Sequence, residues 1–296
     1  MGKLGKKIKI SRRRIIQLVS AVIYNANFKG FAEGSIYKGN IKGICVPGLN
    51  CYSCPGAVAS CPLGSLQSSL TGIKFKLPLY IAGTLIIFGI FLGRSICAFL
   101  CPFGMIQEFL YKIPSAKVKK SKWTRRLSLL KYLILLVFVF ALPVYYLIKT
   151  GVAVPAFCKY ICPAGTLEGG VPLVLANQNL QKIIGALFSW KMSVLIIIII
   201  FAAFIYRFFC RFICPLGAIY SFFNRHAIIG IDVDKTNCVN CKNCVKFCKM
   251  DTRYINDREC LRCGECKQVC NSNAIIYTPK INKIHKEMKN KNENES

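Results

Sequence analysis

The spacing of the cysteines constrains this chain more than any other feature of its sequence. The 296 residues include 18 cysteines, and eight of these lie in two consecutive runs with the same pattern, C-x2-C-x2-C-x3-C. The first run holds Cys238, Cys241, Cys244 and Cys248, and the second holds Cys260, Cys263, Cys266 and Cys270. Regular C-x2-C steps in a long chain indicate metal ligands before disulfides. The sequence therefore predicts a metal-binding domain over residues 230–279.

The pattern of these two runs is that of bacterial ferredoxins with two [4Fe–4S] clusters, in which the fourth cysteine of each run ligates the other cluster. We expect one cluster on Cys238, Cys241, Cys244 and Cys270, and the other on Cys260, Cys263, Cys266 and Cys248. A zinc ribbon is the alternative, but it would use two C-x2-C pairs instead of two runs of four. Lys249 and Asn271 replace the proline usual after the fourth cysteine, which removes no ligand.

Residues 1–229 are apolar enough to predict membrane-spanning helices. Of the whole chain, 54% is hydrophobic, and a helix needs roughly 20 apolar residues to cross a bilayer. Four candidate spans are 15–31, 77–99, 127–148 and 190–209. Gln17, Asn25 and Asn27 interrupt the first, and Pro143 predicts a kink in the third. Buried core helices of a soluble protein are the alternative.

The charge distribution predicts an orientation in the membrane. The formal net charge of +29 is concentrated beside the apolar segments, not on a soluble basic face of the kind that binds nucleic acid. The N-terminus and the loop after the second span are strongly basic, whereas 32–76 and 149–189 are sparse in charge. The positive-inside rule places both termini of a multi-pass inner-membrane protein in the cytoplasm. We expect an uncleaved N-terminal anchor and a polar, disordered tail over 280–296.

One short motif, Cys-Pro-x-Gly, occurs four times in the predicted membrane domain. Its copies begin at Cys61, Cys101, Cys162 and Cys214, and a second cysteine lies four residues before the last three, at Cys97, Cys158 and Cys210. In the first copy that position is Ala57, although Cys51 and Cys54 lie just upstream. Residues 12–111 and 120–224 show the same order of spans and motifs. We therefore predict a parallel repeat with a two-fold axis along the membrane normal.

A two-fold axis of this kind would bring the two inner motifs together and, separately, the two outer motifs. We expect a third cluster at the cytoplasmic membrane face, on Cys97, Cys101, Cys210 and Cys214. The outer candidates are Cys45, Cys51, Cys54, Cys61, Cys158 and Cys162. A fourth cluster would take Cys61, Cys158, Cys162 and either Cys51 or Cys54. Inert buried thiols are the alternative for both sets, and disulfides are a further alternative for the outer one.

The chemistry of Cys-Pro-x-Gly suits an anionic cluster. Proline is favoured in the first turn of a helix, glycine lets the backbone come close to a bulky cofactor, and the free N–H groups of the helix start attract negative charge. Arg94 and Arg207 precede the inner motifs and would compensate further charge. Their alternative role is ordinary snorkelling at a helix end.

In combination, the R-x-x-C-x-F-x-C-P-x-G repeats, the four spans and the eight-cysteine run resemble the NapH-like membrane polyferredoxins, a group that includes related domains of NosR-like proteins. The resemblance implies electron transfer linked to the membrane, often with quinol or an extracytoplasmic redox partner. The inner cysteine pairs and the eight ferredoxin cysteines match the family position by position. The outer cysteines of 45–61 go beyond the NapH pattern.

We therefore expect an α-helical membrane protein, a four-helix bundle joined to a small α+β ferredoxin-like domain. It would pass electrons from a cytoplasmic low-potential donor to a membrane or extracytoplasmic acceptor, plausibly a flavoprotein. No catalytic residue is expected because clusters carry the redox chemistry, so the chain would be an electron-transfer component and not a stand-alone enzyme. One alternative function is a quinone or quinol oxidoreductase subunit. The other is a metallocentre assembly or redox-sensing factor, with the outer cysteines as a dithiol switch.

Overall fold

The structure of the chain, a computed structural model, describes residues 12–70, 79–118 and 120–279. The helices of the first half are α1 (Arg12–Tyr24), α2 (Phe28–Glu33), η1 (Asn40–Gly43), α3 (Pro62–Leu70), α4 (Leu79–Leu92), α5 (Ser95–Phe99) and α6 (Pro102–Leu110). The expected polar tail over 280–296 lies outside the described residues.

The second half begins with one continuous helix over Lys122–Thr150. Its parts are α7 (Lys122–Leu127), α8 (Leu130–Ile134), the π-helix η2 (Leu135–Ala141) and α9 (Leu142–Thr150). There follow α10 (Ala156–Tyr160), the π-helix η3 (Gly165–Gly170), α11 (Val171–Ala176), α12 (Gln178–Lys182), α13 (Ala186–Phe204), α14 (Phe208–Phe212) and α15 (Pro215–Phe223). The helix is not broken at Pro143. The π-helix directly before it changes the local bonding where the proline lacks an N–H.

Within the described residues, two helices are long and apolar enough to cross a membrane, Lys122–Thr150 and Ala186–Phe204. Only 28% and 17% of their most apolar stretches are buried, so most of their apolar side chains face outward. They correspond to the predicted spans 127–148 and 190–209, although the second helix ends at Phe204.

In the described residues neither of the other two predicted spans, 15–31 and 77–99, is one continuous helix, and residues 77–78 lie outside the described ranges. Helix α1 ends at Tyr24, and the side-chain amide of Asn25 bonds the Ala21 carbonyl at this end (3.0 Å). The described part of this helix, 13 residues, covers about 20 Å. The segment 77–99 is divided because Gly93 has a φ of 53° and ends α4 before α5 begins.

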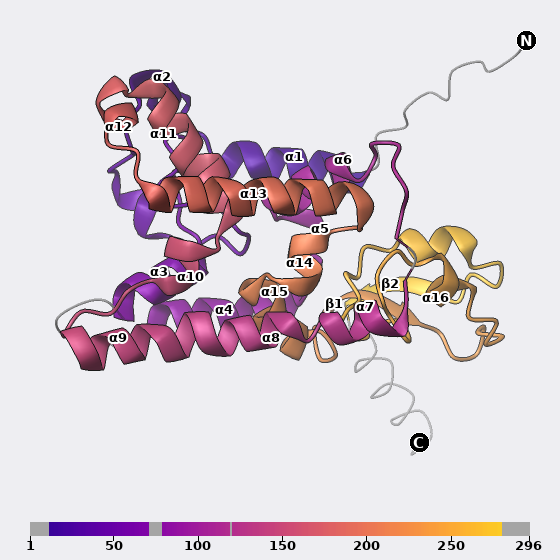
Figure 1. The fold of residues 1–296 in the computed structure, drawn as a ribbon. Coiled ribbons are helices and arrows are strands. Elements are labelled where there is room, and N and C mark those ends of the chain that lie inside the picture. The colour runs from indigo at the N-terminus through magenta and orange to yellow at the C-terminus, as the bar shows by residue number, and fades with distance from the viewer. Residues whose placement is uncertain (1–11, 71–78, 119, 280–296) are drawn as a thin grey trace, which may run out of the picture.

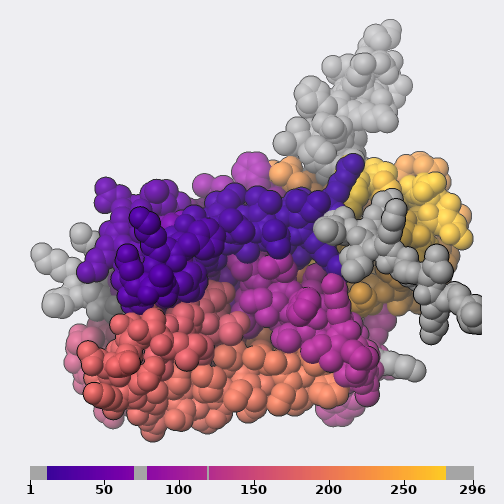
Figure 2. Space-filling view, turned by 90° about the horizontal axis from the view of Figure 1, so that it is seen from above, coloured from indigo at the N-terminus to yellow at the C-terminus, as the bar shows by residue number. Residues whose placement is uncertain are grey.

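The helices run side by side along the length of the molecule, with the C-terminal domain at one end and α2, α11 and α12 at the other (Figure 1). The view from above shows the C-terminal domain at the same end (Figure 2). Helix α6 contacts α1 of its own half and α13 of the other half. Helix α15 correspondingly contacts α8 of its own half and α4 of the other. Each inner motif is thus held between helices of both halves.

The C-terminal domain is built on two antiparallel strands, β1 (Ile229–Val233) and β2 (Ile275–Pro279). The register places Ile229 opposite Pro279 and Val233 opposite Ile275. Between the strands the chain forms a short helix, α16 (Asn243–Phe247), and a 3-10 turn, η4 (Glu265–Val269). Both cysteine runs lie in this connection, so the small paired sheet closes the chain around them.

A buried ionic network holds this domain against the helices. Glu259 pairs with Arg94 (Nη1–Oε2 2.8 Å) and with Lys131 (Nζ–Oε1 2.6 Å), whose side chains are both 0% exposed. Burial opposes ionisation of Glu259, but the two cations hold its pKa below the ordinary value. Asn224 accepts the Arg94 backbone N–H (3.1 Å) and donates to the Cys260 carbonyl (2.9 Å). The domain is therefore fixed by contacts that water does not reach.

Replacing Glu259 by glutamine should destabilise the protein, because Arg94 and Lys131 would remain buried without an anionic partner. Removing one member of a buried ion pair costs about 3–5 kcal/mol. Thermal unfolding in detergent, followed by tryptophan fluorescence, would measure the loss. Glu265→Gln is the matched control. The Glu265 side chain is 32% exposed and, in the described part of the chain, forms an ion pair only with Arg13, so the loss of stability should be about 1 kcal/mol or less. Equal losses would contradict this account.

Candidate metal centres

The structure brings the four inner cysteines together. Cys97, Cys101, Cys210 and Cys214 are all buried, and their thiols lie close enough to interact electrostatically. Cys101 and Cys214 each immediately precede a helix that begins with proline. The Gly217 N–H donates to the Cys214 sulfur (3.4 Å), as expected for a free N–H at a helix start. The predicted inner set is thus a single buried group of four thiols.

Two fully buried arginines cross between the halves at this site. Arg94 Nη2 donates to the Cys210 carbonyl (3.3 Å), and Arg207 Nη1 donates to the Cys97 carbonyl. Neither side chain reaches solvent, so the alternative of snorkelling is wrong. Each arginine instead holds the cysteine segment of the opposite half, and both guanidinium groups lie near the thiols electrostatically.

Glu108 neutralises one of these arginines. It accepts bonds from Arg207 Nε (2.9 Å), the Tyr206 hydroxyl (2.6 Å) and Arg13 Nη2 (2.8 Å). Arg13 also pairs with Glu265 of the C-terminal domain (2.8 Å). The other arginine is tied to the same domain through Glu259, so both charge networks join the inner site to the C-terminal domain.

Four of the six outer cysteines line one cavity, and the other two do not. A cavity of about 310 Å³ is lined by Cys51, Cys61, Cys158 and Cys162. Neither Cys45 nor Cys54 lines it, and the Cys54 thiol instead contacts Asn25 (3.6 Å). Of the two alternatives that the sequence left open, the structure therefore places Cys51 beside the other three.

Glycines make room for this cavity. A Cβ added at Gly165 would lie 3.7 Å from the Cys51 sulfur and 3.8 Å from the Cys162 sulfur, and one at Gly64 would lie 3.9 Å from the Cys158 sulfur. Any larger side chain at these motif positions would extend into the space between the thiols. The glycines of these two Cys-Pro-x-Gly motifs therefore lie directly beside the thiols of the cavity.

A polar residue that was not predicted from the sequence lies six residues after each motif cysteine. The four residues at this position are Gln67, Gln107, Glu168 and Tyr220. Each of these side chains forms a hydrogen bond with a cysteine-bearing segment of the opposite half. Gln67 accepts the Cys158 N–H (3.3 Å), and Glu168 accepts the Cys51 N–H (2.9 Å). Gln107 accepts the Phe209 N–H (2.9 Å) and donates to the Cys210 sulfur (3.1 Å), while Tyr220 donates to the Pro47 carbonyl (2.9 Å). The common spacing was the signal that would have revealed them.

Glu168 is the only acid at this position. Burial raises its pKa to about 7, and the bond from the Cys51 N–H partly offsets that effect. The position thus keeps a polar function in all four motifs while its charge and size vary.

The C-terminal domain gathers its cysteines as two sets. Cys248, Cys260, Cys263 and Cys266 line one small cavity of about 30 Å³. Of the other predicted set, Cys238, Cys241 and Cys244 interact electrostatically, and Cys270 packs with Cys244 against the core around Ile231. The backbone conformation accounts for the tight loops around these cysteines. Positive φ angles occur on both sides of the second cysteine of each run, at Asn240 (54°), Lys242 (57°), Arg262 (52°) and Gly264 (76°).

The cysteine sets follow one another along the molecule. Arg94 bonds both the Cys210 carbonyl (3.3 Å) and the Glu259 carboxylate of the C-terminal domain (2.8 Å), so the inner cysteines adjoin that domain. The Tyr220 hydroxyl interacts electrostatically with Cys61 of the outer set and with three inner cysteines. The inner set therefore lies between the outer cavity and the C-terminal domain.

No group of three or more His, Cys, Asp or Glu residues in the described ranges is arranged to hold a single metal ion.

Comparison with known proteins identifies the motif-bearing segments. A family model described as a 4Fe-4S binding domain matches residues 77–121, 132–172 and 187–232. An uncharacterized protein of Methanocaldococcus jannaschii is 30% identical over 72% of this chain and 82% of its own length. Regulatory protein NosR of Stutzerimonas stutzeri is 25% identical over 59% of this chain and 23% of its own length. Ferredoxin-type protein NapH of Haemophilus influenzae is 26% identical over 24% of this chain and 30% of its own length. No solved structure matches the chain.

Gly104→Ala should destabilise the inner site, because its Cβ would lie 2.9 Å from the Cys97 carbonyl oxygen and 3.2 Å from Arg207 Nη1. Overpacking of this kind costs about 1–3 kcal/mol, which thermal unfolding would measure. Gly83→Ala is the control, since nothing lies within 4 Å of its added Cβ, and alanine in a helix should be neutral or stabilising. A stabilised Gly104→Ala protein would contradict the close contact.

Proposed function

Because the chain belongs to the NapH/NosR-like family of 4Fe–4S proteins, we propose that it carries electrons across a membrane along four [4Fe–4S] clusters. The observation that carries this proposal is the serial order of the cysteine sets: α10 of the outer cavity, α5 and α14 of the inner site, and the C-terminal domain follow one another along the molecule (Figure 1). A bilayer core of ~30 Å is too thick for one efficient electron hop, so a path needs cofactors near both faces.

The residues fit such cofactors. The outer cavity has four thiols on its wall and glycines where larger residues would fill it. We assign this site to Cys51, Cys61, Cys158 and Cys162, the inner site to Cys97, Cys101, Cys210 and Cys214, and the C-terminal sites to the two predicted ferredoxin sets. When bound, the clusters supply one-electron chemistry. The protein fixes the thiols, excludes water and places N–H groups and arginines around them.

The matched helix contacts support a two-fold repeat of 12–111 and 120–224. Helix α6 has the same relation to α1 and α13 as α15 has to α8 and α4. The two arginines are related in the same way, since Arg94 donates to the Cys210 carbonyl and Arg207 donates to the Cys97 carbonyl. A repeat of this kind explains why each cysteine site of the membrane domain takes ligands from both halves.

Membrane insertion is supported by outward-facing apolar helices and by the basic residues beside them. Exposed side chains on the two longest helices include Leu133, Leu136, Ile196, Ile197 and Ile200. The loop that precedes Lys122–Thr150 is basic, which favours the cytoplasmic side. In this orientation the C-terminal domain meets a low-potential donor in the cytoplasm, and the outer cavity faces an extracytoplasmic acceptor.

Anaerobic iron and sulfide analysis tests the path. Four clusters predict about sixteen irons per chain, and about eight would confine clusters to the C-terminal domain and refute a path across the membrane. Cys51→Ser should lower the count to about twelve, because Cys51 lines the outer cavity. Cys54→Ser is the control and should leave the count unchanged, since Cys54 lies outside that cavity.

A second candidate function, quinone or quinol exchange, is favoured by an apolar cavity of about 320 Å³ between α1, α5 and the C-terminal domain. Ile16, Leu92 and Phe99 are among its walls. Ser95 Oγ and Arg262 Nε also belong to residues of this wall, and neither of these buried atoms has a hydrogen-bond partner among the described residues. Two free donors in an apolar site suit a ligand with carbonyl oxygens.

Ile16→Trp should slow oxidation of the reduced protein by menadione, because the larger ring would occupy the cavity. Stopped-flow absorbance of the iron–sulfur bands would report the rate. Ile15→Trp is the control, since Ile15 is 51% exposed and does not line the cavity. An unmodified protein that does not react with menadione would exclude this second function.

A further inference from the structure

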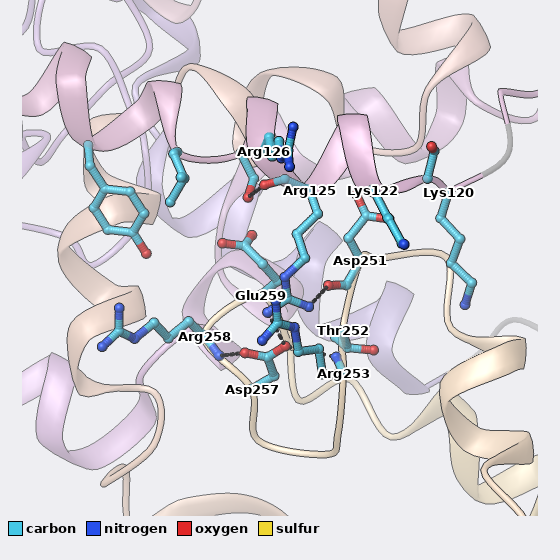
Figure 3. A pocket seen from close by; sticks show the side chains of 14 residues that line it. Lys120, Lys122, Arg125, Arg126, Asp251, Thr252, Arg253, Asp257, Arg258 and Glu259 are labelled. Atoms are coloured by element: carbon cyan, nitrogen blue, oxygen red, sulfur yellow. Dashed lines mark hydrogen bonds and ion pairs between the residues drawn. The ribbon is translucent and has the colours of Figure 1, made fainter.

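A further and larger cavity, of about 720 Å³, lies between the start of helix Lys122–Thr150 and a loop of the C-terminal domain (Figure 3). Lys122 and Arg126 line it from α7, and Arg253 and Arg258 line it from the loop. All four side chains are exposed. In the described part of the chain, none of the four forms an ion pair with a carboxylate.

The carboxylates that line the same cavity form ion pairs with other basic residues. Asp251 pairs with Arg211, Asp257 pairs with Arg125 (3.1 Å), and Glu259 pairs with Arg94 and Lys131. Asp257 also accepts the backbone N–H groups of Arg253 (2.8 Å) and Arg258 (2.6 Å). It thereby fixes the backbone from which two unpaired guanidinium groups extend. The cavity consequently presents excess positive charge to an anion.

The wall toward the proposed membrane is different in character. Leu129 and Tyr132 line the cavity on that side, and Leu129 is 62% exposed. Trp123, which is 77% exposed, lies on the same helix next to the basic residues. Tryptophan is enriched at the level of lipid headgroups. A ligand matched to this site carries an anionic head and an apolar tail.

We propose that this cavity binds the phosphate headgroup of an anionic phospholipid, with the acyl chains along the exposed side of α8. Basic pockets at the cytoplasmic ends of membrane helices attract such headgroups. Because Lys122 and Arg126 come from α7 while Arg253 and Arg258 come from the C-terminal domain, one lipid would bridge both parts. The inference rests on the membrane insertion proposed above.

Native mass spectrometry of the full-length, cluster-loaded protein tests the proposal, with phosphatidylglycerol and phosphatidylcholine offered in turn. Phosphatidylglycerol should be retained preferentially. Arg253→Gln/Arg258→Gln should weaken its binding by roughly tenfold or more, while Asp257 keeps its backbone bonds. The matched control is Lys149→Gln/Lys182→Gln, which removes the same charge from exposed residues elsewhere and should bind like the unmodified protein.

Three results would overturn the proposal. Equal retention of both lipids would remove the role of charge, and an equal loss in the control would reduce it to a general surface effect. Displacement of the lipid by inorganic phosphate at equal concentration would assign the site to a soluble anion. Unchanged lipid binding in Arg253→Gln/Arg258→Gln, with lost cross-linking to an acidic ferredoxin, would assign it to a protein partner. Iron analysis of the same samples separates each outcome from a loss of the clusters.

Discussion

The rest of the structure depends on two buried arginines, each of which forms a hydrogen bond with the opposite half of the helical domain. Arg94 and Arg207 each bind the backbone of a cysteine that belongs to the opposite half. A buried guanidinium is stable only when it is paired, and Glu259 and Glu108 supply that pairing. Since Glu259 lies in the C-terminal domain, the position of that domain and the geometry of the inner thiols are set by one network.

The four Cys-Pro-x-Gly motifs share one local structure, although they lie in different parts of the molecule. Proline starts a helix immediately after the cysteine, and glycine leaves space beside the sulfur atoms. The polar residue six positions later then bonds the opposite half. Identical local chemistry therefore builds two separate thiol sites, because each motif is completed by a segment distant in sequence.

The departures from regular spans follow from the same sites. Helix α4 ends at Leu92 because Gly93 turns the chain toward Arg94, which must point inward to reach the Cys210 carbonyl. Helix α13 ends at Phe204, shortly before Arg207, whose φ is 52°. Both arginines are fully buried, so the helix breaks lie inside the protein and belong to the inner thiol site.

The sequence by itself determined the cofactor class and most of the candidate ligands, because C-x2-C runs and Cys-Pro-x-Gly motifs are local patterns with local physical causes. It also located the two longest apolar helices, since length and hydropathy need no tertiary information. Only the tertiary structure separates Cys51 from Cys54, because both lie in one loop and packing alone places Cys51 on the cavity wall. It likewise revealed the roles of Arg94, Arg207 and the position six residues after each motif. Those roles depend on partners about a hundred residues away, which no local pattern can specify.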